Sequence, residues 1–337
     1  MKWLYFLLLV LVIISCREDE EIEPLYTPVL METPEGFPDI DFPEGSEFTK
    51  ARWVLGKRLF FDEALSLDST ISCATCHKPE LAFSDDIAFS LGVADRVGTR
   101  NAPTLANIAY HPYFTREGGV PTLEMQVLVP IQEHNEFDFN IVLIADRLKQ
   151  DSTYTQMAQS AYDREVDAFV ITRALACFER SLLSGYSLYD QYANHGKENA
   201  LSAPAIRGMD LFFSEKTNCS KCHSDFNFTN YAFQNNGLYE VYTDEGRFRL
   251  TGEESDRALF KVPSLRNIEL TAPYMHDGSL SSLEEVIEHY QTGGKNHPHK
   301  SDLVQPLGLS ESEKLDLIEF LKSLTDETFI SNPLFTK

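Results

Sequence analysis

Cysteines outside two short motifs are scarce in this chain of 337 residues, and so are positively charged residues. Four of its six cysteines fall in two C-x-x-C-H strings, so no cysteine framework is left to staple a small fold. Lysine and arginine number 29 against 52 acidic residues, for a net charge of −23. Because such a surface repels phosphates, we exclude a nucleic-acid partner. The same charge suits a basic protein partner, although keeping an exported protein in solution is the simpler interpretation of it.

The start of the chain carries one apolar run, which is too short to cross a bilayer. Lys2 precedes apolar residues 3–14, a pattern typical of an export signal. The run ends Val-Ile-Ile-Ser-Cys16, which resembles the lipobox of bacterial lipoproteins. We expect residues 1–16 to be a lipoprotein signal peptide. Acylated Cys16 would then be the only membrane anchor of an exported, periplasmic or cell-envelope protein of a Gram-negative-type bacterium. An ordinary cleaved signal is the alternative.

An acidic, proline-rich stretch follows the signal. Residues 17–47 contain five prolines at Pro24, Pro28, Pro34, Pro38 and Pro43, and few apolar residues at helical spacing. A segment of this composition buries too little apolar surface to fold on its own. We expect it to be a tether that holds the body away from the membrane.

The two C-x-x-C-H strings carry the clearest chemical signal. They lie at Cys73, Cys76 and His77 and at Cys219, Cys222 and His223. Two thiols at this spacing can add to the two vinyl groups of one porphyrin, and the adjacent histidine supplies an axial nitrogen to the iron. The sequence therefore predicts two covalently bound haem c groups. Zinc sites, redox dithiols and disulfides also use paired cysteines, but they do not require a histidine directly after the second one.

Both strings lie within a degenerate internal repeat. Gly56-x-x-Leu-Phe-Phe61 precedes the first string, and Gly208-x-x-Leu-Phe-Phe213 precedes the second. This repeat predicts two cytochrome c-like haem domains, at residues 48–200 and 201–330. Apolar periodicity predicts helices near 138–149, 166–184, 283–290 and 310–324. Strand signals are few, with a hairpin as one interpretation of the polar passage 227–258, so the predicted fold is mainly α.

At this point the sequence resembles the bacterial di-haem cytochrome c peroxidases and their relative MauG. The resemblance covers about residues 48–325 and is carried by Leu55-Gly-Lys-x-Leu-Phe-Phe61, Ser72-Cys-Ala-Thr-Cys-His77, Arg100-Asn-Ala-Pro-Thr-Leu105, Thr122-Leu-Glu-x-Gln126, Pro130 to Glu136, and Thr271-Ala-Pro-Tyr-Met-His-Asp-Gly278. It implies that the haem on His77 reacts with peroxide and that the haem on His223 receives electrons.

The resemblance also assigns a peroxide pocket. It implies that Glu136 is the acid–base residue and that Gln126 and Pro130 are its neighbours. Splitting the O–O bond requires a proton to move from the near oxygen to the leaving one, which a positioned carboxylate can do. On the residues alone, this stretch is a polar turn before a helix, in which His134 is a competing acid–base group.

A calcium ion between the haems is implied as well, with Asn101, Thr271 and Pro273 as its ligands. A hard cation prefers side-chain and carbonyl oxygens of this kind. On the residues alone, Asn before Ala-Pro and Thr-x-Pro are ordinary turn sequences.

Two departures from the family pattern concern the first haem and the path between haems. No histidine occurs between His77 and His111, where peroxidases that need reductive activation carry a removable ligand. We therefore expect the first haem to be open, either five-coordinate or water-bound. Arg116 stands where the family has a tryptophan between the haems, and arginine cannot relay electrons.

A third departure concerns the second haem. Tyr290 stands where a methionine commonly binds the iron, and MauG has a tyrosine there. A phenolate oxygen stabilises ferric iron, whereas methionine raises the reduction potential. Met275 and His289 are rival ligands, and a helix aromatic packed in the core is the structural alternative.

Together these features predict a di-haem cytochrome c peroxidase that reduces hydrogen peroxide with electrons from a small donor such as reduced cytochrome c. A MauG-like oxidase acting on a protein or organic substrate is the alternative enzyme. A di-haem electron carrier is the non-catalytic alternative. The resemblance also allows a homodimer, although no sequence feature marks its interface.

Overall fold

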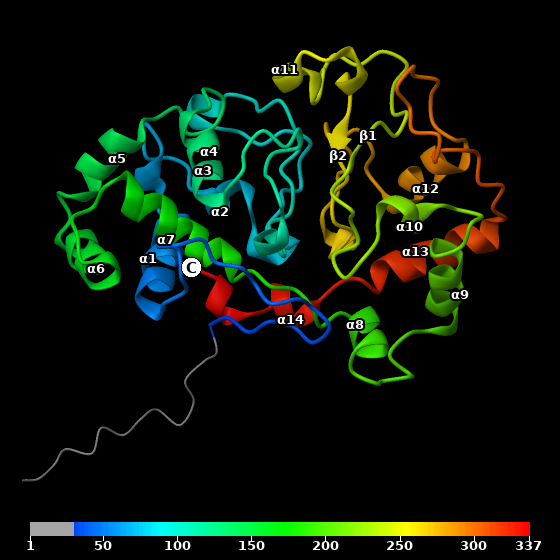
Figure 1. Ribbon diagram of the computed structural model, residues 1–337, viewed down its shortest axis with the longest axis horizontal. Coiled ribbons are helices and arrows are strands. Elements are labelled where there is room, and N and C mark those ends of the chain that lie inside the picture. Colours follow the sequence, from blue (N-terminus) through cyan, green and yellow to red (C-terminus); the bar gives the residue numbers. More distant parts are fainter. Residues whose placement is uncertain (1–29) are drawn as a thin grey trace, which may run out of the picture.

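The computed structural model describes residues 30–337, and the predicted signal peptide with Cys16 lies outside them. The chain forms two helical halves that lie side by side (Figure 1). The first half contains α1 (Lys50–Phe60), α2 (Cys73–Cys76), α3 (Leu123–Gln126), α4 (Leu128–Gln132), α5 (Ile141–Leu148), α6 (Ser152–Tyr162) and α7 (Ala168–Arg180). The second contains α8 (Leu188–Ala193), α9 (Ala203–Phe212), α10 (Cys219–Cys222), α11 (Phe248–Thr251), α12 (Leu283–Gln291) and α13 (Glu311–Lys322), and α14 (Glu327–Ile330) ends the chain's helices.

Strand content is low within residues 30–337. Strand β1 (Phe233–Gln234) pairs antiparallel with β2 (Phe260–Lys261), and the remaining bridges are isolated. The prediction of a mainly helical fold with little strand is therefore confirmed.

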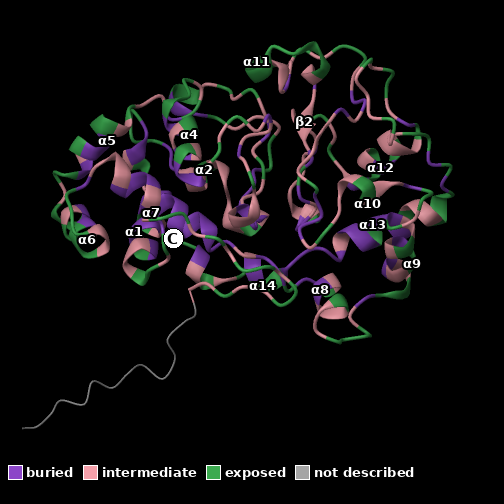
Figure 2. Ribbon diagram, viewed as in Figure 1, coloured by how far each residue is buried: buried purple, intermediate pink, exposed green. Residues whose placement is uncertain are grey.

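The core of the first half forms where α1 crosses α7. A Cβ atom on Gly56 would stand 1.9 Å from the carbonyl oxygen of Ala174, so only glycine allows the two helices to approach this closely. The Phe60 and Phe178 rings then pack with centroids 5.1 Å apart. Figure 2 shows α7 as largely buried. Every residue from Val170 to Arg180 except Arg173 is buried.

The second half repeats this crossing with α9 and α13. A Cβ on Gly208 would stand 1.9 Å from the carbonyl oxygen of Asp316. The Phe212 and Phe320 rings pack with centroids 5.1 Å apart. Helix α13 begins with the predicted capping box, in which the Ser310 backbone N–H donates to the Glu313 carboxylate over 2.8 Å.

Ser184 connects the two halves between α7 and α8. The Asn107 side chain of the first half donates to the Ser184 carbonyl oxygen over 2.8 Å. The Asn267 side chain of the second half donates to the Ser184 hydroxyl over 3.0 Å. The chain end then returns from the second half to the first, where Phe329 and Phe335 join the core (Figure 1). These contacts fix the relative position of the two haem strings.

The last part of the predicted tether lies against the body. The Phe37 ring packs on Tyr110 and Phe226, with centroids 5.9 and 4.7 Å apart. The Tyr110 hydroxyl also donates to the carbonyl oxygen of Pro38 over 3.0 Å. A free spacer would therefore have to come from residues 17–29, which lie outside the described part of the chain. Within residues 30–337, no helix combines the length and apolarity needed to cross a membrane.

Candidate functional site

The first C-x-x-C-H string forms the single helical turn α2. Cys73 and Cys76 form no disulfide. The Nδ1 of His77 lies 2.9 Å from the carbonyl oxygen of Phe83, which favours the tautomer that donates from Nδ1. Burial lowers the pKa of His77 and keeps the imidazole neutral. Its Nε2 is thus the nitrogen left to bind a metal.

The second string has the same geometry in α10. The Nδ1 of His223 lies 3.0 Å from the carbonyl oxygen of Phe228, and burial again lowers the histidine pKa. Cys219 and Cys222 are also free thiols. Among residues 30–337, no three His, Cys, Asp or Glu side chains gather to hold a metal ion. This arrangement gives no support to the zinc and disulfide interpretations.

An apolar cavity of about 240 Å³ lies against the second string. Its lining includes Cys219, Cys222 and His223, together with Val286 and Tyr290 from α12. Free thiols, a neutral imidazole and apolar walls are what a covalently attached haem requires. The residues present therefore fit haem c.

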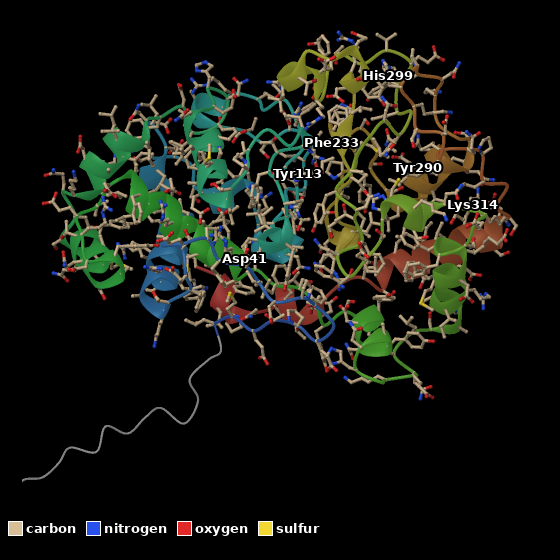
Figure 3. The ribbon with its side chains drawn as sticks, viewed as in Figure 1. Asp41, Tyr113, Phe233, Tyr290, His299 and Lys314 are labelled. Atoms are coloured by element: carbon tan, nitrogen blue, oxygen red, sulfur yellow. The ribbon has the colours of Figure 1, made fainter. Side chains whose placement is uncertain are left out.

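The three candidate ligands for the second iron differ in placement. Tyr290, labelled on α12 in Figure 3, and Met275 both line the cavity. Burial raises the pKa of Tyr290 to about 12. The Met275 sulfur accepts a hydrogen bond from the Asn236 side chain over 3.1 Å. His289 does not line the cavity, and its Nε2 lies 3.0 Å from the Asn236 carbonyl oxygen.

Glu136 lies close to the first haem string. Its backbone carbonyl accepts a 2.9 Å hydrogen bond from the Val93 N–H, which fixes the turn after α4. Glu136 is an exposed residue, yet nearby protein atoms remove enough water from its carboxyl to raise the pKa to about 7, and the charge of Glu133 adds to the shift. The charge of Glu136 in turn helps to raise the pKa of Cys73 and Cys76. The structure thus brings this carboxyl near the predicted haem.

Gln126 and Pro130, the predicted neighbours of Glu136, lie in α3 and α4, the two short helices that precede it. Gln126 ends α3, and its side-chain oxygen is buried without a hydrogen-bond partner. Pro130 lies in α4. His134 is displayed at the surface with 69% of its side chain exposed, and its Nδ1 lies 3.2 Å from Asp138. A rival acid–base role for His134 is therefore poorly supported.

Of the predicted calcium ligands, Asn101 already has both of its oxygens engaged. The Arg116 guanidinium donates to the Asn101 carbonyl oxygen over 2.7 Å and to its side-chain oxygen over 3.3 Å. Both Asn101 oxygens already serve a cation, so the residues present do not fit calcium. The Thr271 hydroxyl lies 3.3 Å from the Ile268 carbonyl oxygen, and Pro273 follows a cis peptide bond.

Glu179 is a buried carboxyl that the sequence analysis missed. It lies in α7, is 8% exposed, and its charge helps to raise the pKa of Cys73. Burial raises the pKa of Glu179 itself to about 8. A charged residue directly after the apolar run 174–178 was the available signal, because it falls on a helix that is buried nearly all round.

The fold and both haem strings define a protein built to carry two c-type haems. A family model described as di-haem cytochrome c peroxidase matches residues 50–199. The methylamine utilization protein MauG of Methylorubrum extorquens is 38% identical over 86% of this chain and 82% of its own length. The cytochrome c551 peroxidase of Nitrosomonas europaea is 31% identical over 85% of this chain and 82% of its own.

Solved structures agree. The crystal structure of a MauG-like protein associated with microbial copper homeostasis has 34% identity and a TM-score of 0.85, covering 90% of this chain and 98% of that one. The di-haem peroxidase BthA of Burkholderia thailandensis, at 20% identity and a TM-score of 0.73, shares the fold. The chain therefore belongs to the family of di-haem cytochrome c peroxidases and MauG, and the family implies haem c as its cofactor.

Proposed function

We propose that this protein is a di-haem cytochrome c peroxidase, which reduces hydrogen peroxide to water with electrons from a small donor such as reduced cytochrome c. When bound, haem c supplies the iron chemistry and stores the electrons. The observation that carries the proposal is the position of Glu136 beside the first haem string, with a pKa raised to about 7.

Glu136 can move the proton that peroxide reduction requires. Two electrons and two protons convert hydrogen peroxide into two waters, and the O–O bond breaks more easily when the leaving oxygen receives a proton. A carboxyl with a pKa near neutrality can take a proton from one peroxide oxygen and return it to the other. The unpartnered oxygen of Gln126 can accept a hydrogen bond from bound peroxide.

We also infer that residues 48–200 and 201–330 are an internal repeat of haem domains, and that the repeat explains an open first site. Thr122 caps α3 and Ser282 caps α12 in the same way, each side chain accepting from a backbone N–H three residues later. Pro130 and Tyr290 both follow their cap by eight residues. Proline has no side-chain atom that could bind iron. Its presence supports a first haem without a protein ligand on that side.

A MauG-like oxidase is the second candidate, and Tyr290 favours it. This tyrosine lines the cavity of the second string, and the chain is 38% identical to a MauG protein. In that case the electrons would come from a protein or organic substrate. Arg116, which also lines the cavity, could not relay them.

The cellular setting is proposed on sequence grounds. The signal and Cys16 support export and lipid anchoring at the cell envelope. A net charge of −23 favours encounter with a basic donor protein.

The spin states of the two irons test the open site. We would record the EPR spectrum of the oxidised protein after confirming two haems per chain. One high-spin and one low-spin signal are expected. Two low-spin, doubly ligated signals would remove the open site and favour the electron carrier. Peroxide consumption with oxidation of an added protein, but not of reduced cytochrome c, would favour the oxidase.

A further inference from the structure

Two backbone hydrogen bonds cross between the halves in matching positions. The Asn101 N–H donates to the His276 carbonyl oxygen over 2.9 Å, and the Lys261 N–H donates to the Arg116 carbonyl oxygen over 2.7 Å. Between the same two halves, Tyr113 stacks on Phe233 with ring centroids 5.2 Å apart (Figure 3). We call the region of these contacts the junction.

A side-chain cation lies at each crossing. Arg116 donates to both oxygens of Asn101, as described above. The Lys261 ammonium donates to the carbonyl oxygen of Tyr113 over 2.9 Å and lies 3.3 Å from the Nδ1 of His111. At the junction, the oxygens of Asn101 and the carbonyl oxygen of Tyr113 thus accept hydrogen bonds from charged nitrogen atoms of the chain itself.

The charged groups of Arg116 and Lys261 are both buried and poorly hydrated. Burial lowers the pKa of Arg116 to about 10 and that of Lys261 to about 8, and the charge of Arg116 contributes to the second shift. Arginine therefore stays charged at neutral pH. A third cation, Arg100, lies nearby and is paired with Asp244 over 2.7 Å and with Glu117.

These charges compete with a divalent ion. Calcium binds oxygens at about 2.3–2.6 Å, so an ion on Asn101 would have to displace the Arg116 guanidinium. The displaced guanidinium would remain beside the ion, and like charges at short range repel strongly where water is excluded.

We propose that the Arg116 guanidinium occupies the cation position at the Asn101 oxygens of the junction in place of calcium. The protein carrying both haems therefore does not bind this ion. The proposal rests on the di-haem assignment, but it is tested by metal content and not by turnover. Arg116 is a positioning residue here, because it ties Asn101 of the first half beside the cavity of the second.

Calcium content tests the proposal directly. The purified di-haem protein would be equilibrated with about 5 mM calcium, above the dissociation constants of weak extracellular calcium sites. After removal of free ion, metal analysis is expected to find well under one calcium per chain. A chelator is expected to leave the ferric haem spectra unchanged. Near-stoichiometric calcium, or a spectral change on chelation, would overturn the proposal.

Arg116→Gln supplies the converse test. It frees both Asn101 oxygens, so we expect uptake of about one calcium per chain and a melting temperature that rises with calcium. Arg249→Gln is the matched control, since that side chain is 56% exposed and its nearest carboxylate contact is 3.9 Å; it should stay calcium-free. An Arg116→Gln protein that carries both haems yet takes up no calcium would refute the role of Arg116. If that variant does not fold, the wild-type calcium content still decides.

Discussion

Glu136→Gln is the substitution that probes the peroxide pocket most sharply. With a pKa of about 7, the carboxyl is about half ionised at pH 7 and about one-hundredth ionised at pH 5. The first proton transfer needs the ionised form. The rate of the reaction with peroxide should therefore rise about a hundredfold from pH 5 and level off above pH 7. Glutamine cannot take up the proton, so its rate should be lower by about 10²–10⁴ at pH 8 and should lose this inflection.

The assay is stopped-flow mixing of the ferric protein with hydrogen peroxide across this pH range, followed by the haem absorbance. Glu133→Gln is the control, because Glu133 is an exposed neighbour whose charge raises the pKa of Glu136. That variant should keep its rate and move the inflection to lower pH. A Glu136→Gln protein that reacts within about threefold of wild type, with the same pH profile, would refute an acid–base role for this residue.

Three further predictions concern ligation and stability. Tyr290→Phe should change the low-spin spectrum of the second haem, because Tyr290 lines its cavity. Gly56→Ala and Gly208→Ala should each destabilise the protein by about 1–3 kcal/mol or more, since the added Cβ would stand 1.9 Å from a carbonyl oxygen; thermal unfolding measures the loss. Glu179→Gln should flatten the pH dependence of the melting temperature. Because folding raises the pKa of Glu179 from 4.5 to about 8, its proton stabilises the native state at low pH, and this contribution, on the order of 5 kcal/mol, is lost between about pH 4.5 and 8.

Each of these has its own control. Met275→Leu should leave the low-spin spectrum intact; a change there, with none in Tyr290→Phe, would make Met275 the ligand. At Gly98 a Cβ would meet its nearest atom at 3.2 Å, so Gly98→Ala should cost less than the two helix-crossing variants. An unchanged slope of melting temperature against pH in Glu179→Gln would show that Glu179 ionises normally in the folded protein.

Local signals predicted the helices well. Apolar periodicity over 138–149 and 310–324 corresponds to α5 and α13, and the Ser310 capping box forms as expected. The polar passage 227–258 allows a hairpin within its own bounds, but β1 pairs with β2, which begins just beyond that passage at Phe260. Periodicity and capping depend on neighbouring residues, so they can be read without knowledge of the fold.

Contacts between distant residues could not be predicted in this way. Arg116 and Asn101 both belong to the first half and lie 15 residues apart, so the contact of the guanidinium with Asn101 depends on how the segment between them folds. Glu136 likewise lies near Cys73 only in the folded chain, a proximity that the family resemblance implied and that periodicity could not predict. Composition also favoured a free tether over 17–47, yet within the described part of that stretch Phe37 packs on Tyr110 and Phe226. A few aromatic contacts can order a polar segment once a surface exists to receive it.

The most direct measurement of the central claim is turnover by the oxidised protein as isolated. Hydrogen peroxide and a reduced small c-type cytochrome would be added without pre-reduction, and donor oxidation followed optically, with Glu136→Gln alongside. The proposal predicts sustained oxidation of two donor molecules per peroxide, strongly slowed in the variant. A haem spectrum that responds to peroxide without donor oxidation would contradict the peroxidase and favour the oxidase, and no response to peroxide would contradict both.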